Sequence, residues 1–249
     1  DAVLKAGGIA EVSSDFDIRV TAKTKSTGGT ISKVSELVTI KVMPYIAFKN
    51  LFLVGDATAA GWNTNNNNQA LYRDASNTNK FYFTGKFGTS MFKLLEILGD
   101  NTWQPQWGLK GGVVANSDGG EPEPFTVSTA GYYTFEVDIL AKTYSITPYS
   151  GAMTTYSSID IAGNLNGWSG STVLTQSSFD PHQWFIKDLV VSSNGEAKFR
   201  ANGTWDINWG AAAEFSGQGT QGGANIPLNA GTYDVYFNDI DGRYVFVKK

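Results

Sequence analysis

The residues best suited to chemistry are the tryptophans of a short stretch that occurs twice. The pattern Thr-Trp-x-x-x-Trp-Gly starts at Thr102 in the first half of the chain and at Thr204 in the second, with an asparagine just upstream. Because an indole is costly to leave half-exposed, each ring either fills a core or is held out as a flat platform for a ligand. A pyranose ring presents a face of C–H groups that stacks on such a platform, and its hydroxyl rim needs polar side chains at the edges. The chemistry indicated by these residues is sugar binding.

Three tryptophan positions recur in the two halves: Trp62 with Trp168, Trp103 with Trp205, and Trp107 with Trp209. The first two positions lie in polar surroundings rich in glycine and asparagine, which favour ligand contact. The third lies directly before a glycine, where backbone must pass closely, and a core ring explains it as well as a ligand contact does. We expect the first ring of each doubled motif to be the platform and the second to anchor the loop. Trp184 aligns with Tyr82 in a predicted strand and is expected in the core.

Polar and cationic side chains near these rings could contact sugar hydroxyls. Asn166 and Asn202 lie close in sequence to the platforms of the second half. Strand alternation places Lys198 and Arg200 opposite Phe199, facing solvent or a ligand if that ring points into the core. An ordinary solvated strand face explains both cations equally well. Two platform rings set at an angle would fit the curved face of an α-glucan, whereas coplanar rings would suit a flat β-glucan.

Side chains that could catalyse a reaction are few. The sole histidine, His182, cannot form a two-histidine metal site or a triad by itself, and its place before a predicted strand favours a solvated loop residue. Glu121 and Glu123 could form the carboxylate pair of a glycoside hydrolase, but they lie in a stiff Gly-Gly-Glu-Pro-Glu-Pro loop that we expect to be exposed. The second half has no equivalent pair. We therefore expect no catalytic residue, no metal site and no cofactor.

Composition narrows the class of protein further. The chain has 249 residues, of which 13% are aromatic and 17% charged, with 28 glycines and a net charge of −4. These proportions favour β-structure, and without a basic field nucleic acid is not an expected partner. The absence of cysteine rules out disulfides and thiolate catalysis. No run approaches the ~20 apolar residues of a membrane-spanning helix.

Residues 1–45 have the pattern of a piece of a domain. Apolar and polar residues alternate over 16–23 and again over 38–42, which is the period of half-buried strands. Two or three strands cannot bury an independent core. We interpret this segment as the C-terminal part of an immunoglobulin-like domain, or as strands that dock on the next part of the chain.

From Leu51 onward, sequence blocks recur in the same order in two segments of about 100 residues each. Their short strands are separated by Gly, Asn, Ser and Asp and show no sustained helical periodicity. A turn-rich stretch at 148–151 separates the copies. We predict an all-β fold of tandem immunoglobulin-like β-sandwich domains, with a partial domain over 1–45 and carbohydrate-binding sandwiches over 46–149 and 150–249.

The order of the motifs Gly-Asn-x-x-Gly-Trp, Lys-Phe-Arg and Gly-Thr-Trp-Asp-Ile-Asn-Trp-Gly resembles that of the SusE/SusF group of starch-binding outer-membrane lipoproteins in Bacteroidetes. Residues 204–210 are also similar to small starch-binding modules attached to amylopullulanases. The resemblance covers residues 46–249 and implies non-catalytic modules that hold α-glucan at the cell surface, beside a TonB-dependent transporter and its partner lipoproteins. The lipidated cysteine of that family is expected to precede Asp1.

The resemblance also implies sites that combine two aromatic platforms with a Lys or Arg. In the second copy these residues are Trp168, Trp205 and Lys198 or Arg200, with Asn202 and Asn166 as edge contacts. In the first copy they are Trp62, Trp103 and Lys93. The first copy departs from the pattern, because Leu95 stands where Arg200 would be and the spacing from Lys93 to Trp103 is longer. Two other functions fit the sequence: a structural or adhesive spacer with buried tryptophans, and a binding appendage of a larger glycoside hydrolase.

Overall fold

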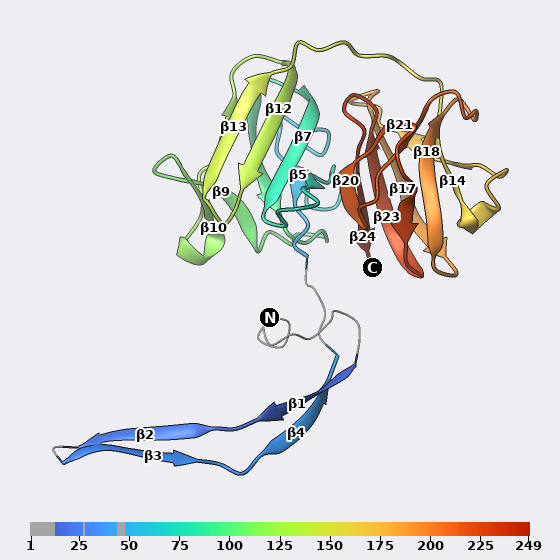
Figure 1. The fold of residues 1–249 in the computed structure, drawn as a ribbon. Coiled ribbons are helices and arrows are strands. Elements are labelled where there is room, and N and C mark those ends of the chain that lie inside the picture. The colour runs from blue at the N-terminus through green and yellow to red at the C-terminus, as the bar shows by residue number, and fades with distance from the viewer. Residues whose placement is uncertain (1–12, 27, 44–47) are drawn as a thin grey trace. The chain divides into compact units, whose positions relative to one another are not determined.

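The computed structural model describes residues 13–26, 28–43 and 48–249, and these are built almost entirely from β-strands (Figure 1). The helices among the described residues are two single 3-10 turns, η1 (Ser117–Gly119) and η2 (Asn164–Asn166). The prediction of an all-β fold is therefore confirmed. None of the described helices is long and apolar enough to cross a membrane. The chain divides into two compact units, Asp1–Phe48 and Lys49–Lys249.

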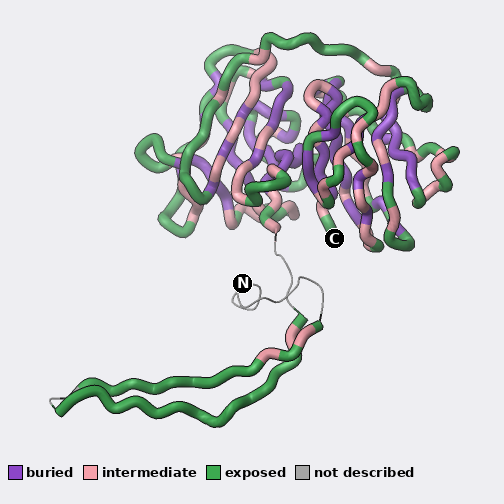
Figure 2. The backbone as a smooth tube through the Cα atoms, in the orientation of Figure 1, coloured by how far each residue is buried: buried purple, intermediate pink, exposed green. Residues whose placement is uncertain are grey.

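The first unit contains two antiparallel strand pairs. Strand β1 (Ser14–Ile18) pairs with β4 (Val38–Val42), and β2 (Thr21–Ser26) pairs with β3 (Gly29–Val34). The described side chains of these strands are almost all exposed, as the green tube in Figure 2 shows. Ile31 and Val34 of β3 are among the exposed apolar side chains. The alternating sequence thus forms strands without burying an apolar face among the described residues. Its interpretation as the end of an immunoglobulin-like domain stays a prediction.

The second unit contains two copies of a two-sheet arrangement, here named the first module (49–149) and the second module (150–249). In the first module one sheet has the order β10-β9-β8-β11, with β5 also pairing with β8, and the other has the order β13-β12-β7-β6. The strands of the first sheet are β5 (Phe52–Val54), β8 (Ser90–Leu95), β9 (Gln106–Lys110), β10 (Val113–Asn116) and β11 (Phe125–Val127). Those of the second are β6 (Tyr72–Arg73), β7 (Lys80–Phe87), β12 (Gly131–Asp138) and β13 (Thr143–Pro148).

The second module repeats this plan. Its sheets have the orders β15-β14-β18-β19-β21, with β22 also pairing with β18, and β16-β17-β23-β24-β20. The strands of the first sheet are β14 (Ile159–Gly163), β15 (Thr172–Val173), β18 (Gly195–Ala201), β19 (Asn208–Gly210), β21 (Thr220–Gln221) and β22 (Ile226–Leu228). Those of the second are β16 (Thr175–Gln176), β17 (Gln183–Val191), β20 (Ser216–Gln218), β23 (Gly231–Asn238) and β24 (Arg243–Lys248).

Each module buries an aromatic core between its sheets. In the first, Phe92 lies 5.2 Å from Phe125 and 5.1 Å from Phe135, measured between ring centroids. In the second, Phe199 stacks on Phe237 at 4.3 Å. All five rings are fully or almost fully buried. Alternation along the strands sends these rings inward, so the neighbouring side chains of the same strands face outward.

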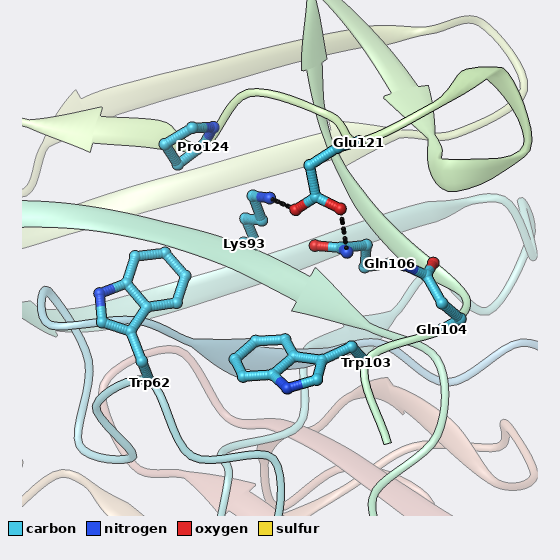
Figure 3. A pocket seen from close by; sticks show the side chains of 7 residues that line it. All are labelled: Trp62, Lys93, Trp103, Gln104, Gln106, Glu121 and Pro124. Carbon is cyan, nitrogen blue, oxygen red and sulfur yellow. Dashed lines mark hydrogen bonds and ion pairs between the residues drawn. The ribbon is translucent and has the colours of Figure 1, made fainter. Parts of the chain in front are cut away.

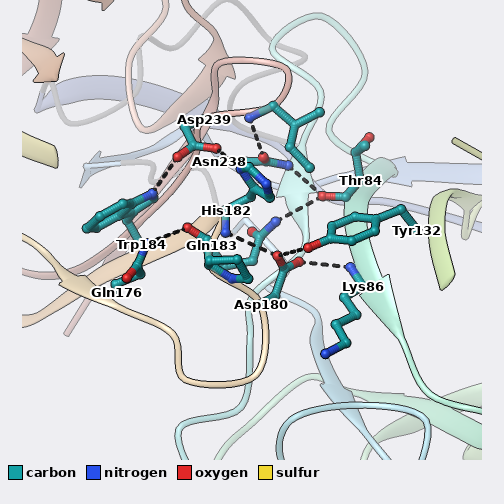
Figure 4. Close-up of polar contacts among 12 residues, drawn as sticks. Thr84, Lys86, Tyr132, Gln176, Asp180, His182, Gln183, Trp184, Asn238 and Asp239 are labelled. Carbon is teal, nitrogen blue, oxygen red and sulfur yellow. Dashed lines mark hydrogen bonds and ion pairs between the residues drawn. The ribbon is translucent and has the colours of Figure 1, made fainter. Parts of the chain in front are cut away.

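A buried polar seam joins the two modules (Figure 4). The backbone carbonyl of Thr84 accepts hydrogen bonds from the side-chain amides of Gln183, at 2.9 Å, and Asn238, at 2.7 Å. The Tyr72 hydroxyl donates to the Gln183 amide oxygen at 2.7 Å. The Ser216 hydroxyl donates to the carbonyl of Arg73. Because buried polar groups are costly to leave unpaired, these bonds resist separation of the modules.

His182 lies beside this seam, and the expectation of a solvated loop residue was wrong. It is only 4% exposed, and its Nδ1 lies 2.7 Å from Oδ1 of Asp239. The other carboxylate oxygen of Asp239 accepts a hydrogen bond from Nε1 of Trp184 at 2.7 Å. The ring of Tyr132, from the first module, packs edge-on against the imidazole. Packing of one module against the other covers a histidine that its local sequence would leave in solvent, whereas Trp184 lies in the core as predicted.

The buried Asp239 carboxyl predicts a pH dependence of stability. Burial raises its pKa from 3.8 to about 6, against the lowering effect of the hydrogen bonds from Trp184 and His182. The folded protein therefore holds this proton more tightly than the unfolded chain, so the contribution of Asp239 to stability falls as pH rises through that window. A difference of one pKa unit between the folded and the unfolded chain corresponds to about 1.4 kcal/mol in the free energy of unfolding.

The measurement is urea unfolding of the wild type and of Asp239→Asn between about pH 4 and pH 7. The other titrating groups are common to both proteins. The unfolding free energy of the wild type minus that of the variant should therefore fall as the pH rises across this range. A difference that is constant or rises with pH would contradict the raised pKa.

Candidate functional site

The structure brings the predicted platform tryptophans together in pairs, one pair in each module. The ring centroids of Trp62 and Trp103 are 6.5 Å apart, with the planes inclined by 39°. Those of Trp168 and Trp205 are 6.0 Å apart and inclined by 36°. The two modules thus build nearly the same arrangement, although the loops that carry the rings differ in length.

Strand register shows that the two sites are equivalent. Lys93 pairs with Val54 across β8 and β5, and Lys198 pairs with Ala162 across β18 and β14. In each module the partner of the lysine is followed by a closely packed glycine, Gly55 after Val54 and Gly163 after Ala162. Lys93 and Lys198 therefore occupy the same position, and two residues later Leu95 of the first module takes the place of an arginine in the second.

Backbone hydrogen bonds hold the first ring of each pair. In the first module the Gly55 amide donates to the Gly61 carbonyl at 2.7 Å, and the indole N–H of Trp62 donates to Asp56 at 3.1 Å. In the second, Trp168 follows η2 and its amide donates to the Gly163 carbonyl at 2.9 Å. The φ of Trp168 is +64°, a left-handed conformation that is strained for a bulky side chain. The fold thus maintains a strained backbone at the position of this ring.

The second tryptophan of each doubled motif is an anchor. Trp107 and Trp209 are only 7% and 8% exposed and belong to the two cores. The Trp209 ring packs against Phe237 at 5.2 Å and Tyr156 at 5.4 Å. A Cβ on the following Gly210 would collide with the carbonyl oxygen of Ala224, which explains the glycine after the ring. The expected division into a platform ring and an anchor ring agrees with this burial.

The platform rings remain open to solvent. Trp62 is 39% exposed and Trp205 is 42% exposed, whereas Trp103 and Trp168 are partly buried. Each pair therefore contains one exposed indole and one partly buried indole that packs against it. Two neighbouring indoles with one ring exposed form an apolar surface that a ligand could cover.

Arg200 lies beneath the Trp205 ring. Its guanidinium carbon is 4.5 Å from the ring centroid, its Nε donates to Asp160 at 2.8 Å, and another nitrogen donates to the Gly170 carbonyl at 2.9 Å. The residue is buried. Alternation correctly puts Arg200 opposite Phe199, but Trp205 covers it, so in this structure it supports the platform and does not face solvent.

Lys198 lies beside the same platform. Its ammonium donates to Oδ1 of Asn208 at 3.0 Å, and the Asn208 amide donates to the Trp205 carbonyl at 2.8 Å. Asn208 thus links the cation to the platform loop, a role that the residue pattern alone did not assign. Its position in the doubled motif, directly before the anchor ring, is the signal that could have found it.

The two asparagines expected as edge contacts hold the loops in shape. Asn166 accepts from the Gly163 amide at 3.0 Å and donates to the Ile161 carbonyl at 2.9 Å. Asn202 accepts from the Ser157 amide at 3.0 Å. These bonds position the loops that carry the second-module platforms. Contact between either asparagine and a ligand stays a prediction.

The first-module platforms lie over a pocket of about 470 Å³ (Figure 3). Its lining residues are Trp62, Lys93, Trp103, Gln104, Gln106, Glu121 and Pro124. The buried ammonium of Lys93 forms an ion pair with Glu121, and Gln106 donates to the other Glu121 oxygen at 2.9 Å. Glu121 does lie in an exposed loop, with its side chain 67% exposed, but the sequence did not show that it reaches Lys93. Within the described part of the chain, no three His, Cys, Asp or Glu side chains gather to hold a metal ion.

No protein-family model matches the chain, and no curated protein sequence matches it. Among solved structures, SusF from Bacteroides thetaiotaomicron is similar, with 19% sequence identity and a TM-score of 0.32. The match covers 99% of this chain but only 60% of that one. This similarity does not identify a ligand.

The division between platform and anchor predicts two different mutant phenotypes. Trp209→Ala should lower the free energy of unfolding by about 3–5 kcal/mol, because it empties a packed aromatic site. Trp205→Ala should cost about 1 kcal/mol or less, since the ring is half in solvent and mainly covers Arg200. Chemical denaturation of both variants measures the difference. Equal losses would mean that the two rings have the same structural role.

The left-handed backbone of Trp168 predicts an unusual order of stabilities. Trp168→Gly should be more stable than Trp168→Ala by about 1 kcal/mol, because glycine adopts a positive φ without a steric penalty. At an ordinary exposed position alanine would be the more stable of the two. Urea unfolding of both variants tests this, and a more stable alanine variant would show that the backbone relaxes once the ring is removed.

Proposed function

We propose that residues 49–249 bind an α-glucan such as starch at the cell surface without cleaving it. The observation that carries the proposal is the recurrence of the same inclined indole pair in both modules, each with one ring open to solvent. A purely structural spacer has no need of this arrangement, because its tryptophans would be buried like Trp107 and Trp209.

The inclination of the rings favours a curved ligand. The planes differ by 39° in the first module and 36° in the second. An α-linked glucan curves along its length and follows two inclined faces, whereas a flat β-linked chain calls for coplanar rings. Lys93 and Lys198 lie next to these faces, in position to bond sugar hydroxyls at the edge of the stack.

The exposed area of the rings limits the affinity of a single site. A large aromatic side chain can bury roughly 150–250 Å², so covering the open two-fifths of Trp62 or Trp205 removes on the order of 80 Å² from water. At about 25 cal/mol per Å² this gives about 2 kcal/mol for each open ring. With the partner ring and a few hydrogen bonds, the affinity of one module falls in the range of about 1 mM or somewhat tighter.

The site geometry favours binding over hydrolysis. A glycoside hydrolase needs two carboxyl groups facing one bond, one of them free to donate a proton. Glu121 in the first pocket is held by Lys93 and Gln106, and Asp160 in the second module is buried against Arg200. We propose that neither is catalytic. The resemblance of the motifs to surface lipoproteins further supports an outer-membrane location and partnership with a TonB-dependent transporter.

Calorimetry with matched glucans tests the proposal. Maltoheptaose and amylose should bind, and cello-oligosaccharides of equal length should bind at least about tenfold more weakly, because the inclined rings do not fit a flat chain. Trp62→Ala and Trp205→Ala should each reduce binding and together abolish it. Leu140→Ala, which truncates an exposed apolar side chain outside both sites, is the control.

Three outcomes would count against this function. If the folded protein binds no glucan, the carbohydrate-binding proposal fails. If the cello-oligosaccharides bind as well as the maltoheptaose, the α-glucan assignment fails. Release of reducing ends during incubation with amylose would show that the chain is a glycosidase.

A further inference from the structure

The carboxylate of Glu121 distinguishes the first site from the otherwise similar second site. It reaches from an exposed loop into the first pocket, where it contacts the Lys93 ammonium and the Gln106 amide (Figure 3). The Lys93 side chain is 9% exposed and the Glu121 side chain is 67% exposed. A buried ammonium needs a partner, so Glu121 neutralises the charge of the first pocket from its solvent side.

The second module has no carboxylate at this position. Glu123 approaches Gly108 as Ala224 approaches Gly210, which places Gly222 at the position that corresponds to Glu121. Lys198 donates to the neutral amide oxygen of Asn208, and it forms no ion pair with any carboxylate of the described residues. Lys198 therefore has no carboxylate partner among the described residues, whereas Lys93 has one.

A buried acceptor in the first pocket points to the kind of ligand it takes. Gln106 is 2% exposed, and its Oε1 accepts no hydrogen bond from any described residue. Its amide nitrogen is fixed by Glu121, so the amide cannot flip without losing that bond. Figure 3 shows this oxygen on the side of the group where Lys93 and the two indoles lie. A buried acceptor without a donor is destabilising, and because this oxygen is closed to solvent, a ligand hydroxyl would satisfy it once the side chains around it shift.

We propose that Glu121 makes the first pocket selective for neutral, hydroxyl-rich sugars and excludes anionic ones, whereas the second site accepts both. This inference rests on the proposed carbohydrate binding. A sugar hydroxyl can donate to Gln106 Oε1 or Glu121 and accept from Lys93, because it is both donor and acceptor. A uronate carboxylate would meet Glu121 as a like charge and would have to displace it from Lys93.

The experiment compares one glucan in two charge states. The ligands are maltoheptaose and the same chain oxidised at C6 to carboxylates, titrated calorimetrically into the Trp168→Ala/Trp205→Ala protein, in which only the first site remains. We expect the neutral chain to bind at least about tenfold more tightly than the oxidised one. Adding Glu121→Gln should strengthen binding of the oxidised chain about tenfold, so that the ratio of the neutral to the oxidised affinity falls toward one.

The matched control is Glu123→Gln in the same loop. It removes the same charge from a residue whose backbone pairs with Leu109 and whose side chain makes no described ion pair. An equal effect of Glu121→Gln and Glu123→Gln would show that only net charge matters and would overturn the proposal. No change in selectivity with Glu121→Gln would also overturn it.

A second variant keeps the test informative if Glu121→Gln is unstable. Gln106→Leu removes the unpartnered oxygen, so the melting temperature should hold or rise while affinity for maltoheptaose at the first site falls at least about threefold. Unchanged affinity would overturn the role of Gln106. If the wild type binds glucan but the Trp168→Ala/Trp205→Ala protein does not, this inference fails and the proposed function stands. If the wild type binds no glucan, both fail.

Discussion

The burial of one tryptophan in each module is the constraint on which the sites depend. Trp107 and Trp209 pair in register with Leu94 and Phe199 and fill the cores beneath the platform loops. Four residues earlier in the chain lies the platform ring of the same motif, exposed in the second module as Trp205 and partly buried beside the exposed Trp62 in the first as Trp103. A loop rich in glycine and asparagine would otherwise sample many conformations, and ordering it at the moment of binding would weaken affinity. Burial of the anchor ring orders the loop during folding. The loop therefore loses less conformational entropy when a ligand binds, and its indole keeps one orientation.

The supports beneath the platforms differ between the modules. In the second, the Arg200–Asp160 pair lies under Trp205, and leaving either charge unpaired there would be costly. In the first, Leu95 replaces the arginine and the polar groups move to the pocket wall, where Glu121 joins Lys93. The two modules therefore keep the geometry of the rings while the charge around them varies. Such variation is easy to accommodate, because loops tolerate substitution better than the cores that hold them.

How much the sequence could predict depended on the range of the interactions. Ordered repetition predicted two tandem modules, and strand alternation predicted that Arg200 and Phe199 lie on opposite faces, because both signals are local. The burial of His182 depends on Asp239, 57 residues away, and the pairing of Lys93 with Glu121 spans 28 residues. Contacts between distant segments leave no periodic trace in one sequence. The angle between two rings depends in the same way on how separate loops meet.

The seam around the Thr84 carbonyl has a consequence for ligands long enough to reach both modules. Donors from Gln183 and Asn238 join the second module to the first, and both modules belong to one compact unit, so separating the two sites would break these buried hydrogen bonds. Once a chain is held at one site, the second encounter is intramolecular, and its effective concentration is set by geometry and not by the amount of sugar in solution. Under the proposed function, two weak sites would therefore retain a long polymer for longer than a short fragment that reaches only one of them.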